Sequence, residues 1–296
     1  PKLVMAGCRV AICDQLEDPK QTKKIVKRGV TELVTPGVAL NDDILKSKSN
    51  NFLAAIHFNS TKKNKDEIGI SFLDVSTGEF LISQGNSDYI DKLIQNFKPS
   101  EILFSKQKRK LFAEIFGTHH HVFHLEDWVF QSDYAEEALN KQFNTTSLKG
   151  FGVERLSSGI IAAGAALHYL SETRHHKLQH IAKIARIAEN EYVWMDRFTI
   201  GNLELYHASS QNAVTLLDVI DKTISPMGGR LLKRWVALPL KKKDKITNRH
   251  EVVSYLIKKQ PVLTAIQTNI KCIGDIERLI SKVATGKVSP REVVQL

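Results

Sequence analysis

The hydrophobic pattern of this chain changes its period near Gly150, and this change limits the folds open to it. Residues 52–58 (FLAAIHF) are a near-continuous apolar run of strand length, and residues 68–75 and 79–83 are further strand-like segments. The next predicted elements are a helix over 88–97, a strand over 101–104, a helix over 108–116 and a strand over 121–125. Three strands followed by alternating helix and strand indicate a mixed sheet with helices packed on it, and so a compact α/β domain.

Beyond Gly150 the apolar spacing is helical. Residues 157–171 form one predicted helix, whose small side chains suggest close packing against a neighbour. After a brief predicted strand over 191–195, helices are predicted over 202–207, 215–220, 227–235, 245–258, 262–270 and 273–283, and a new one begins at 290. Pro226 and Pro239 mark the start and the end of one of these helices. Residues 177–296 are therefore predicted to form an all-α module.

The N-terminal part carries two predicted strands, residues 8–14 and 30–34, and the second ends at a turn, Thr35-Pro36-Gly37. The polar residues 41–51 are predicted to be a linker. A chain of 296 residues also exceeds what one hydrophobic core usually serves. The fold class is thus α/β plus all-α, and the predicted parts are a partial α/β segment (1–46), an α/β domain (47–176) and a helical module (177–296).

Three cysteines are too few and too scattered for a disulfide framework, so a reducing compartment is expected. Cys8 and Cys13 are predicted to be small buried residues beside a strand. The longest apolar runs, such as residues 159–167, fall short of a membrane span, and no membrane association is expected. The chain begins at Pro1 without a leader pattern, and we expect it to be a piece of a longer protein.

The formal net charge of +10 is unevenly distributed. The segments 1–46, 47–176 and 177–296 carry +2, −1 and +9 respectively. Such an excess suits attraction to phosphate backbones, and a solvated lysine-rich helical face explains it equally well. The candidate DNA contacts are a basic stretch between the first two strands: Lys23, Lys24, Lys27 and Arg28. A second basic run, Lys241 to Lys245, is interpreted as a solvated loop, with a phosphate contact as the alternative.

No glycine-rich loop followed by Lys and Ser or Thr is found in the sequence. The nearest pattern, Met227-Gly228-Gly229-Arg230, lacks the lysine, and its glycines are interpreted as allowing two helices to approach closely. A histidine cluster, His119, His120, His121 and His124, has no carboxylate or cysteine at ligand spacing. We therefore predict structural or surface histidines and no metal site.

Asp74 and Glu79 stand on neighbouring predicted strands, where a ribonuclease-H-like nuclease would hold Mg²⁺. Two-metal hydrolysis needs three or four carboxylates, and the later acidic residues have no evident reason to meet Asp74. The alternative hypothesis is a Mg²⁺-dependent nuclease that uses Asp74. The favoured interpretation of Ser76-Thr77-Gly78 is a plain turn that Asp74 helps to cap.

Short segments spread along the whole chain form an ordered set. In the first half they are residues 6–7, 10–15, 34–37 and 72–80. In the second half they are residues 202–205, 215–217, 227–235, 239–240, 275–279 and 289–291. In order and spacing, this set resembles the bacterial DNA mismatch-recognition proteins of the MutS family. One departure is Gly201, where the family usually has Arg before Asn-Leu-Glu, which puts any contact of that Arg in doubt.

The resemblance implies a layout for the three predicted parts. Residues 1–46 would be the C-terminal part of the mismatch-recognition domain, 47–176 the connector domain, and 177–296 the first part of the helical core or lever domain. In the family the connector has a non-catalytic ribonuclease-H-like fold, relays nucleotide-dependent changes and helps to recruit MutL. The full-length protein is a homodimer that binds mismatched DNA and uses ATP and Mg²⁺ to signal repair.

The resemblance also implies what this part of the protein would lack. The mismatch wedge would precede Pro1, and the ATPase and dimerisation site would follow Leu296. We therefore expect no catalytic residue, no nucleotide-binding residue and no cofactor in the fragment, which should not hydrolyse ATP. The expected location is the bacterial cytoplasm, in association with the nucleoid.

Overall fold

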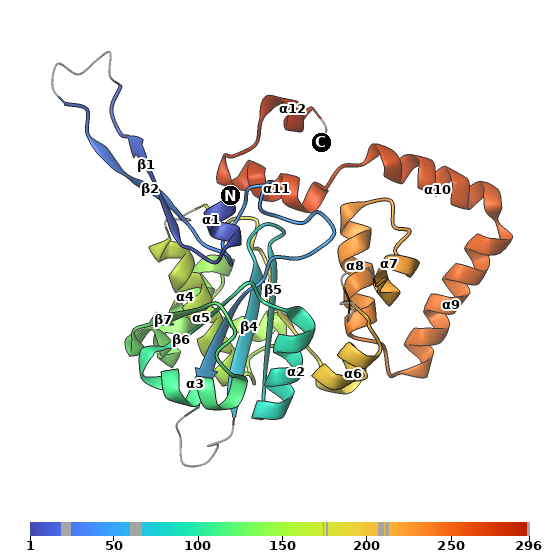
Figure 1. Ribbon diagram of the computed structural model, residues 1–296, viewed down its shortest axis with the longest axis horizontal. Helices are drawn as coiled ribbons and strands as arrows, with labels where there is room; N and C mark the ends of the chain where they lie inside the picture. Colours follow the sequence, from blue (N-terminus) through green and yellow to red (C-terminus); the bar gives the residue numbers. More distant parts are fainter. Residues whose placement is uncertain are drawn as a thin grey trace.

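The computed structural model describes residues 1–18, 25–59, 67–173, 175, 177–206, 210 and 213–294. The chain begins with the short helix α1 (Lys2–Met5) and the strands β1 (Val10–Gln15) and β2 (Arg28–Val34). β1 and β2 pair antiparallel and project as an arm from the rest of the molecule (Figure 1). Both strands predicted from the sequence are confirmed, with ends displaced by one or two residues.

Six strands form one mixed sheet in the order β7-β6-β3-β4-β5-β8. They are β3 (Leu53–Phe58), β4 (Ile68–Asp74), β5 (Glu79–Gly85), β6 (Glu101–Ser105), β7 (Val122–Leu125) and β8 (Ala185–Arg186). β4 runs antiparallel to β3 and β5, whereas β6 and β7 run parallel to β3. The predicted mixed sheet is confirmed.

Helices cover both faces of this sheet, which explains the continuous apolar run at 52–58. Leu53 and Ala55 enter the core on one face, and Ala54 and Ile56 enter the core on the other. The first core is closed by α4 (Ser132–Phe143) and α5 (Ser157–Glu172), and the second by α2 (Ser87–Phe97) and α3 (Arg109–Phe116). Successive strand residues point to opposite faces, so a strand buried on both faces is apolar throughout.

Helix α4 is absent from the sequence-based prediction. Its sequence is mostly polar, and Ala135 and Leu139 are its two buried residues. It packs on α5 closely, because a Cβ added at Gly164 would lie 2.5 Å from both Cα and Cβ of Ala135. The close packing predicted for the small residues of 157–171 is therefore confirmed, and the neighbour is α4.

Replacing Gly164 by alanine should destabilise this helix pair, because the added methyl group overlaps the backbone of α4. Overpacking of this kind costs about 1–3 kcal/mol. The matched control is Gly201→Ala in α6 (Arg197–Asn202), where nothing lies within 4 Å of the added Cβ. Alanine in that open helical position should stabilise by about 0.5–1 kcal/mol. Hydrogen exchange of the amides in each helix measures both effects. If both substitutions changed the stability in the same direction, the packing argument would be contradicted.

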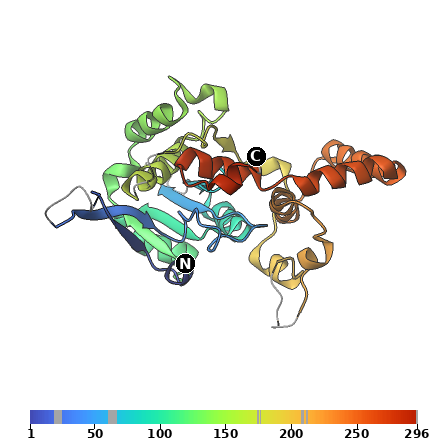
Figure 2. The ribbon, with the colours of Figure 1, turned by 90° about the horizontal axis from the view of Figure 1, so that it is seen from above.

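The C-terminal region is helical from α6 onward, as predicted, whereas Ala185–Arg186, inside the predicted all-α module 177–296, form β8 and pair with β5 of the sheet. Besides α6 this region contains α7 (Leu216–Ile220), α8 (Pro226–Ala237), α9 (Lys243–Lys258), α10 (Gln260–Cys272), α11 (Ile276–Thr285) and α12 (Pro290–Val293). Short 3₁₀ helices occur at η1 (Lys106–Lys108), η2 (Asp127–Phe130), η3 (Leu148–Phe151) and η4 (Glu189–Glu191). Figures 1 and 2 both place α9 and α10 far from the sheet, with α8 between.

Capping residues explain several helix starts. Ser225 accepts a hydrogen bond from the Gly228 amide ahead of Pro226, and Ser289 and Glu292 form a capping box at α12. Both starts agree with the sequence. Two further predictions are wrong. Residues 191–195 do not form a strand, because η4 and one bridge between Tyr192 and Leu240 occupy this stretch. The helix placed at 202–207 instead begins at Arg197, where Asp196 caps it, and ends at Asn202; residues 207–209 lie outside the described part.

The prediction of buried cysteines is also wrong, since Cys8 and Cys13 are both exposed. Cys13 lies on the arm formed by β1 and β2, and a two-stranded ribbon has too few neighbours to cover both faces. No helix within the described ranges is long and apolar enough to cross a membrane.

Candidate functional site

The linker that leads into the sheet passes between α8 and α11 and is held there by two buried arginines. Arg230 on α8 is 3% exposed, and its Nη1 donates to the Ser47 carbonyl at 2.9 Å. Arg278 on α11 is 6% exposed, and its Nη2 donates to the carbonyls of Lys46 at 3.0 Å and Ser49 at 2.8 Å. Side chains of the helical region therefore bind the backbone carbonyls of the linker directly.

Two carboxylates hold Arg230 in place. Asp275 accepts from Nη1 and Nη2 at 2.7 and 2.6 Å, and Glu277 accepts from Nη2 at 2.7 Å. Burial by itself would lower the pKa of Arg230, but these hydrogen bonds outweigh burial and raise it. Burial would likewise raise the pKa of Asp275, and Arg230 holds it below its usual value. This bidentate geometry gives a strong, directional contact between α8 and the start of α11.

Lysine side chains add contacts between the linker and both α8 and the turn that precedes it. Lys48 donates to Asp221 Oδ1 and to the Thr223 carbonyl, both at 3.0 Å. A Cβ added at Gly229 would lie 2.6 Å from Cγ of Lys48. The interpretation that Gly229 allows two helices to approach is therefore wrong, because the linker takes that place. Lys233 donates to Ser49 Oγ at 2.9 Å.

We call the place where the linker meets α8, α11 and the sheet the junction. On the sheet side it contains Asp74 and Glu79, which face each other on β4 and β5. Asp74 is fully buried and accepts from Asn50 Nδ2 at 2.9 Å and from the Asn51 amide at 3.1 Å. Its other oxygen accepts from the amide and the hydroxyl of Ser76 at 2.9 and 2.7 Å, so the capped turn is confirmed. The Asp74 carboxylate thus ties the linker to the β4–β5 turn.

Glu79 connects the sheet to α8 through an ion pair with Arg234. Burial raises the pKa of Glu79, although the Arg234 guanidinium opposes this shift. No group of three or more His, Cys, Asp or Glu side chains in the described ranges could hold a metal ion. Five hydrogen bonds and an arginine engage the two carboxylates, so the nuclease alternative has no support.

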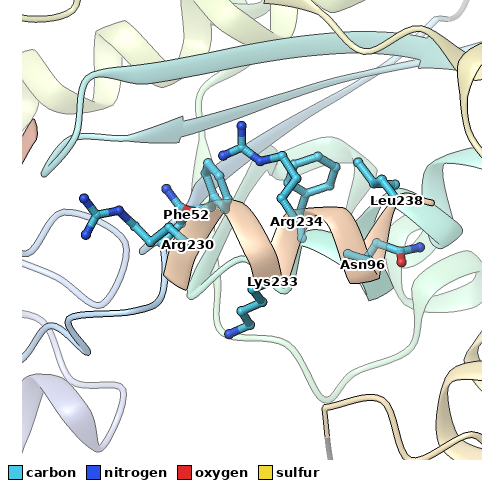
Figure 3. A pocket seen from close by; sticks show the side chains of 9 residues that line it. Phe52, Asn96, Arg230, Lys233, Arg234 and Leu238 are labelled. Carbon is cyan, nitrogen blue, oxygen red and sulfur yellow. The ribbon is translucent and has the colours of Figure 1, made fainter. Parts of the chain in front are cut away.

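A small pocket lies where α8 meets the sheet and α2 (Figure 3). Apolar walls come from residues of the sheet entry, α2 and the end of α8: Phe52, Phe97, Ala237 and Leu238. Asn96 and Lys233 are among its polar lining residues. Its volume of about 40 Å³ has room for a few water molecules or one small ion.

The N-terminal segment is attached to the sheet by a second buried carboxylate, Glu101 at the start of β6. It accepts from Thr35 Oγ1 at 2.5 Å, from the Gly37 amide at 3.1 Å and from the Tyr169 hydroxyl at 2.7 Å. The guanidinium of Arg9 lies 3.8 Å from the centre of the Phe123 ring. Residues on both sides of the arm are thus fixed to the sheet and to α5.

The basic residues predicted to contact DNA lie on or beside the arm. Lys23 and Lys24 fall outside the described residues. Lys27 is exposed and pairs with Glu17 at 3.7 Å, and Arg28 is exposed at the start of β2. Their contact with DNA stays a prediction.

The other candidates are dispersed. Lys242 and Lys245 of the second basic run pair with Glu191 at 3.5 and 2.7 Å. The rings of His119 and His120 lie 4.0 Å apart, whereas a Cβ added at Gly7 would meet His121. Sequence reasoning assigned no role to Arg278, and it considered Glu101 only as an acidic residue with no evident reason to meet Asp74. The available signal for Arg278 was the N-cap Asp275 three residues before it.

Comparison with known proteins matches the whole chain. The family model for MutS domain I matches residues 1–43, that for MutS domain II residues 51–182, and that for MutS domain III residues 198–296. The DNA mismatch repair protein MutS of Christiangramia forsetii is 69% identical over all 296 residues, which cover 33% of that protein. The proteins of the same name from Flavobacterium johnsoniae and Flavobacterium psychrophilum are 68% and 66% identical, and the chain covers 34% of each.

The chain therefore spans about a third of the length of these relatives. Three consecutive domain matches and high identity over every residue lead to one assignment: the chain belongs to the MutS family of DNA mismatch repair proteins.

Proposed function

We propose that this chain is an internal part of a mismatch-repair protein in which a signal passes between the DNA-binding and ATP-using parts. The full-length protein would be a homodimer that binds mismatched DNA, uses ATP with Mg²⁺, and works in the bacterial cytoplasm at the nucleoid. The name shared by its relatives supports the repair role. This part itself would supply no catalytic residue.

Within this proposal, residues 1–46 complete the mismatch-recognition domain, 47–176 form the connector and 177–296 begin the helical core. A ribonuclease-H-like fold for the connector is supported by its three consecutive antiparallel strands followed by parallel strands. The connector would also be the part that docks MutL.

The observation that carries the relay proposal is the linker held from both sides. Arg230 and Arg278 bind its carbonyls from the helical region, while Asp74 binds Asn50 and Asn51 from the sheet. A displacement of α8 or α11 would therefore pull on the linker, and through it on the N-terminal segment and the β4–β5 turn. Coupling of this kind needs such a contiguous, well-packed connection between two elements.

The ion pair between Arg234 and Glu79 offers a test with little structural cost, since partly exposed pairs contribute about 1 kcal/mol or less to stability. In the full-length protein, Arg234→Gln should leave mismatch binding and basal ATP turnover near normal. The change in ATP turnover caused by mismatched DNA should fall about fivefold, the lower end of typical coupling energies. Glu79→Gln should give the same loss.

The matched control is Arg249→Gln on α9, because Arg249 contacts the Trp235 ring and not the sheet. It should leave the coupling unchanged. Equal coupling in Arg234→Gln and Arg249→Gln would refute the relay through this contact.

A further inference from the structure

The two buried arginines of the junction share the nearby carboxylates unequally. Arg230 donates hydrogen bonds to both Asp275 and Glu277. Arg278 donates through Nη2 to two carbonyls of the linker, and within the described ranges it donates to no carboxylate. Its Nε is buried and has no hydrogen-bond partner there. One of two neighbouring buried cations is thus paired with two carboxylates, while the other is hydrogen-bonded to none.

The unpaired Nε of Arg278 lies close to a carboxylate that is already in use. A buried donor without an acceptor is costly, so this atom calls for an explanation. Asp275 Oδ2 lies 3.9 Å from it, near enough for attraction between the charges but too far for a hydrogen bond. Burial and the charge of Arg230 lower the pKa of Arg278, although Asp275 opposes this shift. Arg278 would gain a hydrogen bond if Asp275 moved about 1 Å toward it.

Arg230 would not be left unpaired by this movement, because Glu277 also binds its guanidinium. Glu277 accepts from Nη2 of Arg230 at 2.7 Å and from Nε at 3.2 Å. Its side chain is half-exposed, so it can follow the guanidinium with little loss of packing. A shift of Asp275 to Arg278 would then give each arginine one carboxylate. Two arrangements that exchange hydrogen bonds of the same kind can lie close in free energy, which a two-state element requires.

The backbone before Asp275 allows such a shift. Gly274 stands between the end of α10 and Asp275, and nothing lies within 4 Å of a Cβ added there. Helices α9 and α10, which lie wholly within the described ranges, contain no buried residue. They lie away from the sheet, and α10 leads directly into α11 (Figure 1). A rotation of α10 about Gly274 would therefore move Asp275 without disrupting a packed core.

We propose that Asp275 is an exchangeable counter-ion, which pairs with Arg230 in this structure and with Nε of Arg278 when α10 is displaced. In the second arrangement the start of α11 is detached from α8, and Arg230 keeps Glu277. The helical region then holds the linker mainly through α11. The exchange supplies a two-state element for the relay proposed above, and it rests on that proposed function only for the event that displaces α10.

Double-mutant cycles in the full-length protein, followed by hydrogen exchange of the amides of α8 and α11, test the exchange. One cycle combines Asp275→Asn with Arg230→Lys, and the other combines Asp275→Asn with Arg278→Lys. Asparagine keeps the acceptor that caps α11, and lysine keeps the positive charge but lacks the guanidinium Nε. The cycles therefore measure the hydrogen bonds of each guanidinium apart from its charge.

Each cycle is measured without ligand and with a non-hydrolysable ATP analogue plus mismatched DNA. Without ligand, Asp275 should couple to Arg230 by about tenfold or more in exchange rate, the effect of charge-assisted hydrogen bonds, and should not couple to Arg278. With both ligands the coupling to Arg278 should rise to about fivefold or more, and that to Arg230 should fall. The control cycle, Glu191→Gln with Lys245→Met, breaks an ion pair of 2.7 Å outside the junction. Its coupling, followed at the amides of α9, should be the same in both conditions.

A third measurement needs no ligand. Because Arg230→Lys weakens the contact that holds Asp275, coupling between Asp275 and Arg278 should appear in the Arg230→Lys background alone. Coupling that appears there but not with the ligands supports the exchange and counts against the proposed relay. The exchange is overturned if Asp275 and Arg278 fail to couple under any of these conditions, as a fixed structural contact predicts. A water molecule bound to Nε of Arg278 in crystal structures of the full-length protein both with and without the ligands would equally overturn it.

Discussion

Replacing Arg230 by methionine is expected to lower the free energy of unfolding of the junction by about 3–5 kcal/mol, the usual cost of removing one partner of a buried ion pair. Methionine fills a similar volume but donates no hydrogen bond. Asp275 would then be left partly buried without its main partner, and the Ser47 carbonyl would lose its donor. Hydrogen exchange of the amides of α8 and of residues 46–51 measures the effect, and both should exchange much faster.

Two variants separate this effect from a general loss of charge. Arg230→Lys keeps the positive charge but cannot form the bidentate contact, so an intermediate loss is expected. Arg249→Met removes a guanidinium that lies 3.6 Å from the Trp235 ring and should cost about 1 kcal/mol or less. If Arg230→Met and Arg249→Met lower the free energy of unfolding by the same amount, the hydrogen bonds of Arg230 to the linker and to Asp275 contribute no additional stability.

The sequence predicts the sheet well because its signal is local. Residues 52–58 are apolar throughout because β3 is buried on both faces, and the length of the run is that of one strand. Helix α4 has a weaker signal, because Ala135 and Leu139 are its two buried residues and the rest of its sequence is mostly polar. Tyr134 and Phe143 also pack against this core, so a helical spacing is present that the prediction did not use.

The junction could not be predicted from local patterns. Arg230 binds Ser47, 183 positions earlier, and Arg278 binds Lys46, 232 positions earlier. In the sequence a buried arginine cannot be distinguished from an exposed one, because only the fold brings a carboxylate to it. The resemblance to MutS predicted the order of the domains, whereas the contacts between them are set by the fold.

The junction and the Glu101 site share one physical principle. In each, a buried charged group lies at the point where separate parts of the chain meet, and its hydrogen bonds go to backbone groups of the segment that it holds. Backbone contacts fix the position of a segment whatever its side chains are. The structure thus attaches the N-terminal segment at both ends of the stretch from Thr35 to Asn51.

Replacing Glu101 by alanine is expected to release the N-terminal segment from the sheet and to cost about 3–5 kcal/mol. Three donors, from Thr35, Gly37 and Tyr169, would lose their acceptor in a buried place, and each unsatisfied group costs about 1–3 kcal/mol with incomplete additivity. Fast hydrogen exchange at Gly37 and faster proteolysis of the arm should accompany the loss. Glu114→Ala, on the exposed side of α3, is the matched control and should change stability by about 0.5 kcal/mol or less.

Glu101→Gln distinguishes charge from hydrogen bonding at this site. Glutamine keeps one acceptor oxygen but places an amide donor among three donors, so it should recover only part of the loss, and Tyr169→Phe should cost about 1 kcal/mol because a single bond is removed. Slow exchange at Gly37 in Glu101→Ala would mean that Thr35 and Gly37 are held by packing against Leu53, since a Cβ at Gly37 would lie 2.7 Å from that side chain. Fast exchange in Glu101→Ala with near-normal exchange in Tyr169→Phe assigns the attachment to the carboxylate itself.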